Sequence, residues 1–97
     1  MIEAKTVAEL LSDPTHWGKK FFCVDQFGES VNSCSDDGYK WCVAGAIAKI
    51  YRTSGEMFLA TKKLAEARGA FTDSNNIVWN DSVDYETMIA TVRKAGI

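Results

Sequence analysis

The side chains that could carry out covalent chemistry in this sequence are one histidine and three cysteines. His16 is the only imidazole, and the thiols belong to Cys23, Cys34 and Cys42. A cysteine near a helix N-terminus with a histidine partner is the minimal nucleophile and base of thiol enzymes. Cys42 used with His16 or Asp81 would therefore give a small hydrolase-like or transferase-like enzyme.

The surroundings of Cys42 in the sequence favour a structural role instead. Cys42 lies in the most apolar run of the chain, from Trp41 to Ala48. A thiol packed in such a run is inert, and free cysteine is among the most buried residue types. We therefore interpret Cys42 as a core residue and expect a protein that is not an enzyme. The cysteine-dependent enzyme stays as the alternative.

The cysteines do not have the spacing of a metal site. Structural zinc ligands usually come in pairs that are separated by two to four residues. Ten residues separate Cys23 from Cys34, and seven separate Cys34 from Cys42. An odd number of cysteines in a chain without an export signal predicts free thiols. We expect no metal and no cofactor.

Trp79, Asn80 and Asp81 form the second polar candidate. In the functional interpretation, Asn80 and Asp81 are exposed polar groups of a site at a helix N-terminus. As a structural group, Trp79 would anchor the core while Asn80 or Asp81 accepts hydrogen bonds from backbone N–H groups. The structural interpretation is favoured.

Acidic residues are segregated along the chain, and this pattern is the strongest indication of function. No Lys or Arg lies between Lys20 and Lys40, or between Arg68 and Arg93. If the fold brings these segments together, they would steer association with a basic partner. Alternatively, several of these acids only cap helices. The predicted partner-binding residues are Asp25, Glu29, Asp36, Asp37, Asp73, Asp81, Asp84 and Glu86.

Composition indicates one globular domain spanning residues 1–97. Hydrophobic residues make up 46% of the chain and charged residues 25%, which is the balance of a folded protein. The formal net charge of −2 argues against direct binding to nucleic acid or to an anionic membrane. No apolar run approaches the roughly 20 residues that cross a bilayer. Together with the absent export signal, this predicts a cytoplasmic protein.

Helix signals are clear in three places. The capping boxes that start at Thr6 and Thr53 each predict a helix, the second of which stops at Gly69. A last helix begins after Ser82 or Asp84 and carries one apolar stripe.

The remaining elements are a hairpin, a central helix and a short strand. Residues 19–33 predict a β-hairpin with its turn at Gln26 to Glu29. The stretch from Tyr39 to Tyr51, capped by Ser35, Asp36 or Asp37, predicts a buried helix that Gly45 keeps thin. Residues 70–81 predict a loop that ends in a buried strand, Ile77 to Trp79. The expected fold is α+β and mainly helical, with about four helices and a β-hairpin packed on the buried central helix.

Two short motifs resemble a family of small bacterial and bacteriophage proteins of unknown function. The first is W-C-V-A-G-A-I, from Trp41 to Ile47, and the second is W-N-D, from Trp79 to Asp81. In that family the first motif lies on a helix and the second opens the last helix. The resemblance implies a cytoplasmic protein of bacterial or phage origin and brings no activity. It spans residues 17 to 95, with Trp17, Asp25, Gly28 and Val31 also in place.

The expected function is binding and modulation of a host macromolecule, such as a nucleic-acid-handling or defence complex. The partner would be a protein with a basic surface. A self-associating structural module is a third class that the sequence leaves open, since it does not give the oligomeric state.

Overall fold

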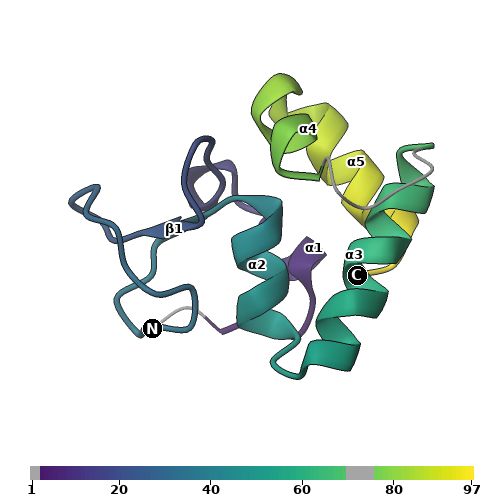
Figure 1. The fold of residues 1–97 in the computed structure, drawn as a ribbon. Coiled ribbons are helices and arrows are strands. Elements are labelled where there is room, and N and C mark those ends of the chain that lie inside the picture. Colours follow the sequence, from purple (N-terminus) through teal and green to yellow (C-terminus); the bar gives the residue numbers. More distant parts are fainter. Residues whose placement is uncertain (1–2, 70–75) are drawn as a thin grey trace.

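The structure, a computed structural model, describes residues 3–69 and 76–97. The described part is mainly helical with one two-stranded antiparallel sheet, so the predicted α+β class is confirmed (Figure 1). None of the described helices combines the length and the apolar composition that crossing a bilayer requires. The described elements are α1 (Val7–Leu10), the 3-10 helix η1 (Pro14–His16), β1 (Cys23–Val24), β2 (Lys40–Trp41), α2 (Val43–Ile50), α3 (Ser54–Ala67), α4 (Asn76–Ser82) and α5 (Tyr85–Ala95).

Helix α1 begins where its capping residue predicts. The Thr6 hydroxyl accepts a hydrogen bond from the Glu9 N–H at 3.0 Å. The Glu9 carboxylate reaches back to the Lys5 N–H, at 2.8 Å, instead of to the N–H of the cap itself. The first backbone N–H of the helix also has a partner, because the Val7 N–H donates to the Ile97 carbonyl oxygen. The start of the described chain is thereby joined to its end.

The first strand of the predicted hairpin pairs with a strand that lies further along the sequence than expected. β1 lies antiparallel to β2, with Cys23 opposite Trp41 and Val24 opposite Lys40. Inside the predicted segment only one isolated bridge forms, between Val24 and Ser30. The predicted turn is present, and Gly28 adopts a φ of +83° that favours glycine. The long connection between the strands is therefore a loop, visible on the left of Figure 1.

The central helix α2 starts four residues later than predicted. Lys40 and Trp41 belong to β2, and the N-cap of α2 is Cys42. The expected capping by Ser35, Asp36 or Asp37 is wrong, because strand pairing holds the residues after them in an extended conformation.

Close packing explains the glycine in this helix. A Cβ atom on Gly45 would collide with the carbonyl oxygen of Phe22, the residue before β1. The sheet therefore packs against α2 as predicted, and Gly45 allows that approach. Trp41 is fully buried beside it, with its indole N–H donating to the Ser33 carbonyl oxygen at 3.0 Å.

Helix α3 confirms the second capping box. The Thr53 hydroxyl accepts from the Glu56 N–H at 3.2 Å and donates to the Glu56 carboxylate at 2.9 Å. The helix ends before Gly69, which has a φ of +78° as the predicted stop requires.

The predicted strand from Ile77 to Trp79 is wrong, because these residues lie in α4. Ile77 and Val78 are exposed, so the apolar triplet is not buried as a strand would bury it. The buried face of α4 carries Asn76 and Asn80 instead, which are four residues apart and so lie on one side of a helix. Because the inner face of α4 is polar, its apolar residues do not recur at helical spacing, and the sequence pattern did not indicate a helix.

Helix α5 is capped by Asp84, one of the two predicted caps. The Asp84 carboxylate accepts from the Thr87 N–H at 2.8 Å, and Gly96 ends the helix with a φ of +73°. α5 packs along α3 and buries the predicted stripe. The core that these helices share includes Val7, Leu10, Leu11, Trp41, Val43, Ile47, Leu64, Met88, Ile89, Val92 and Ile97.

Candidate functional site

Cys42 is held in the interior of the structure. Only 2% of its surface is exposed, and its sulfur accepts a hydrogen bond from the Gly45 N–H at 3.4 Å. Burial raises the pKa of the Cys42 thiol above its ordinary value, which outweighs the opposing effect of the hydrogen bonds from Gly45 and Ala44. A thiol in these surroundings stays protonated and out of reach of a substrate.

His16 is engaged elsewhere. Its Nδ1 lies 2.7 Å from the Tyr39 carbonyl oxygen, and its ring packs edge-on against Tyr39 with centroids 4.9 Å apart. A carbonyl only accepts hydrogen bonds, so Nδ1 must carry the proton. Among the described residues no hydrogen bond joins His16 to Cys42. The arrangement gives no support to a thiol nucleophile with a histidine base.

The thiols should differ sharply in reactivity. All three are free, but Cys23 and Cys42 are buried while Cys34 is exposed. Burial also raises the pKa of Cys23. Near neutral pH we therefore expect a thiol-specific chromogenic reagent to label one group per folded chain, and three after denaturation.

The matched control for this labelling is the variant Cys34→Ser, which should show no fast phase. If that variant shows a fast phase that disappears when Cys42 is also substituted, the hypothesis of a thiol enzyme would be supported again.

The described residues contain no group of three or more His, Cys, Asp or Glu side chains placed to hold a metal ion.

Asn80 joins three segments that are distant in sequence. It is fully buried, and its Oδ1 accepts from the Trp17 indole N–H at 2.7 Å and from the Val43 N–H at 3.0 Å. Its Nδ2 donates to the Gly18 carbonyl oxygen at 3.0 Å. Both partners of Oδ1 are pure donors and Gly18 O is a pure acceptor, which fixes the orientation of the amide.

The hydrogen bond from the Val43 N–H to Asn80 gives α2 a partner that the helix itself lacks. The first backbone N–H groups of a helix lack partners within it, and Val43 is the first residue of α2. Asn80 satisfies that N–H in the interior, where water cannot. The W-N-D motif and the W-C-V-A-G-A-I motif therefore meet at this hydrogen bond.

The rest of the W-N-D motif is also structural. The Asp81 carboxylate accepts from the Lys20 N–H at 2.9 Å and from Asn80 Nδ2 at 3.2 Å. Lys20 has a φ of +68°, an uncommon conformation for a residue other than glycine, and this hydrogen bond helps to hold it there. Trp79 packs against the core while partly exposed. The structural interpretation of this motif is thus supported, although its backbone partners are remote in sequence.

Three of the four acids of the first segment, Asp25, Asp36 and Asp37, line a hollow in the loop between β1 and β2, and Glu29 does not. Asp25 Oδ1 accepts from the N–H groups of Phe27 and Glu29, both at 2.9 Å, and so fixes the turn. Phe27 projects from this turn with 81% of its surface exposed. We call Asp25, Phe27, Asp36 and Asp37 the acidic loop surface. The hollow measures about 420 Å³ and is lined by Asp25, Gln26, Phe27, Asp36, Asp37, Gly38 and Tyr39.

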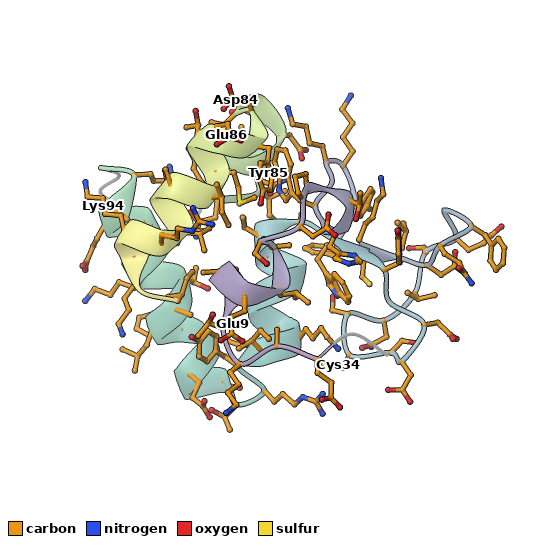
Figure 2. All side chains as sticks on the ribbon, turned by 180° about the vertical axis from the view of Figure 1, so that it is seen from behind. Glu9, Cys34, Asp84, Tyr85, Glu86 and Lys94 are labelled. Carbon is orange, nitrogen blue, oxygen red and sulfur yellow. The ribbon has the colours of Figure 1, made fainter. Side chains whose placement is uncertain are left out.

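The second acidic segment lies elsewhere. Figure 2 shows Asp84 and Glu86 together at the start of α5, far from Cys34, which belongs to the loop between β1 and β2. Hydrogen bonds from the Thr87 side chain and backbone lower the pKa of the Asp84 carboxyl, as its capping role requires. Asp84 and Glu86 therefore lie apart from the loop that carries the first acidic segment, so the condition for one combined surface is not met at these two residues. Asp73 lies outside the described residues.

Phe27 was missed by the sequence analysis. An aromatic residue between Gln26 and Gly28, at the centre of a tight turn, has no neighbours on the outer side to cover it. This position in the turn was the available signal.

No family model, curated protein or solved structure matches the chain.

Proposed function

We propose that this chain is a small cytoplasmic protein of phage or bacterial origin that binds a host macromolecule and modulates it. The partner is a protein with a basic surface, of the kind found in nucleic-acid-handling or defence complexes. The acidic loop surface is the docking site. The observation that carries the proposal is the exposed aromatic ring of Phe27, which lies beside Asp25, Asp36 and Asp37 in a hollow that no described Lys or Arg lines.

The chemistry of this surface suits protein recognition. Aromatic side chains that fill a pocket of the partner contribute much of the binding energy of protein interfaces. Carboxylates around such an anchor steer a basic partner and suppress acidic ones. Asp25 Oδ1 is engaged in the turn, and Asp36 also lines a second hollow with Lys5, Lys49 and Arg52. The exposed carboxylate of Asp37 is therefore the charge that faces a basic partner most directly.

The alternative, a cysteine-dependent enzyme, finds less support. Its nucleophile would be Cys42, whose sulfur is buried and hydrogen-bonded to the backbone. A substrate would have to displace packed core residues to reach it.

Affinity capture from bacterial lysate tests the proposal, using the wild type and the variants Phe27→Ala and Asp37→Lys. Both substitutions are at exposed positions, so we expect the fold to be unchanged. Phe27→Ala should weaken capture about tenfold or more, which corresponds to a loss of at least about 1.4 kcal/mol. Asp37→Lys should weaken it most at low salt, where steering is strongest.

Two control variants lie on α3. Phe58→Ala removes another exposed ring, and Glu66→Lys reverses another exposed carboxylate. Both should capture the partner as the wild type does. If no protein is retained at low salt, or if control and loop variants lose binding equally, the proposal is wrong.

A further inference from the structure

A small apolar hollow lies beside the exposed face of α3. Its volume is about 130 Å³, and the buried side chains of Ala60 and Ile97 form part of its lining. Leu59 stands at its edge with 56% of its surface exposed, and Tyr51 lines it from the end of α2. An apolar cavity of about 150 Å³ is enough to hold a benzene ring. The hollow is therefore on the scale of one aromatic side chain.

The same molecule presents such a ring. Phe27 stands on a turn that is fixed by the two hydrogen bonds to Asp25 Oδ1 and by the left-handed Gly28. Little backbone freedom is left to lose when the ring is bound, which favours association. Moving the exposed phenyl ring of Phe27 out of water also favours association.

The charges around the ring and around the hollow are complementary. Phe27 lies beside Asp25, Asp36 and Asp37 in a hollow that no Lys or Arg of the described residues lines, whereas the hollow on α3 is lined by one cation, Lys63, and one carboxylate, Glu56. Lys63 lines the hollow on α3. Its neighbour in the sequence, Lys62, is exposed on the same helix. The carboxylate of Glu56, which also lines the hollow, is hydrogen-bonded to the Thr53 hydroxyl.

The two surfaces cannot meet within one chain. Figure 1 shows the loop between β1 and β2 on one side of the molecule and α3 on the other. We infer that Phe27 of one copy docks into the α3 hollow of a second copy, with the carboxylates of the acidic loop surface facing Lys62 and Lys63. This contact joins different surfaces of the two copies, so it repeats head to tail instead of closing as a symmetric dimer.

The association is weak. One ring and a few exposed charges form an interface well below the roughly 1,200 Å² that stable complexes bury. We expect a dissociation constant on the order of 0.1–1 mM. The contact shares Phe27 with the proposed function, so self-association competes with the partner for the same ring, while the α3 hollow takes part in self-association alone.

Sedimentation equilibrium from about 10 µM to 1 mM tests this inference. The average mass of the wild type should rise with concentration, and less so at high salt. Phe27→Ala and Leu59→Lys, both at exposed positions, should each stay monomeric over the whole range. An equimolar mixture of the two variants should form dimers and nothing larger, because the mixture contains one intact ring and one intact hollow.

Each other outcome overturns the inference. These are a wild type that stays monomeric at the highest concentration, a Leu59→Lys variant that still associates, and a mixture that does not recover dimers. Leu59→Lys also separates this inference from the proposed function, because it leaves the acidic loop surface intact. That variant should capture the lysate partner as well as the wild type does.

Discussion

Replacing Asn80 with Ala should lower the free energy of unfolding by about 3 kcal/mol or more, measured by denaturant titration. The substitution leaves the Val43 N–H, the Trp17 indole N–H and the Gly18 carbonyl without their partner. A buried polar group that loses its partner costs roughly 1–3 kcal/mol. Trp17 and Gly18 are only partly buried, so water can replace Asn80 there more easily than at Val43, which keeps the sum below three full penalties.

Ser82→Ala is the matched control on the same helix. The Ser82 hydroxyl is exposed, and among the described residues it donates only to carbonyl oxygens of its own helix, those of Val78 and Trp79. Its removal should change stability by no more than about 0.5 kcal/mol. An Asn80→Ala variant as stable as Ser82→Ala would show that the hydrogen bonds of Asn80 do not hold α2, α4 and the Trp17 segment together.

The substitution Gly45→Ala should destabilise the protein by about 2 kcal/mol or more, although alanine favours helices by about 1 kcal/mol over glycine. The added methyl group would collide with the Phe22 carbonyl oxygen, which is backbone and cannot rotate away. That oxygen also accepts a hydrogen bond from the Cys42 N–H at 3.2 Å. Moving it would disturb the cap of α2 as well as the approach of the sheet.

Gly55→Ala provides the control with the opposite sign. Gly55 lies in the first turn of α3, and a Cβ atom there would meet no other atom within 4 Å. Alanine at this exposed position should leave the midpoint of thermal unfolding unchanged or raise it. Equal effects of the two substitutions would mean that close packing at Gly45 is not what requires glycine.

The sequence predicted the elements whose signals are local. Thr6, Thr53 and Asp84 each bond to an N–H three residues further on, and Gly69 and Gly96 stop the helices by a left-handed φ. These interactions involve neighbours along the chain, so residue type and spacing are enough to identify them.

Elements that depend on distant partners were predicted less well. Lys40 and Trp41 are extended because they pair with β1, which overrides the apolar run that suggests helix. Helix α4 was missed because its inner face carries Asn76 and Asn80, whose burial makes sense only with Arg68 and Trp17 in place. Polar residues at helical spacing are normally a solvated face.

The candidate site shows the same division. The acidic segments were visible as charge runs, but their separation on the molecule follows from tertiary packing. The prediction that Cys42 is buried is confirmed, although it caps α2 instead of lying within it. Phe27 became a candidate only when its exposure was known.

The central claim is that the two tryptophan-containing motifs build the fold while the acidic loop surface meets the partner. Amide hydrogen exchange of the chain, free and bound to the captured partner, tests this most directly. We expect binding to slow exchange in residues 25–39 and to leave residues 79–81 and 42–46 unchanged. Protection confined to those motif residues, with residues 25–39 unaffected, would contradict the account.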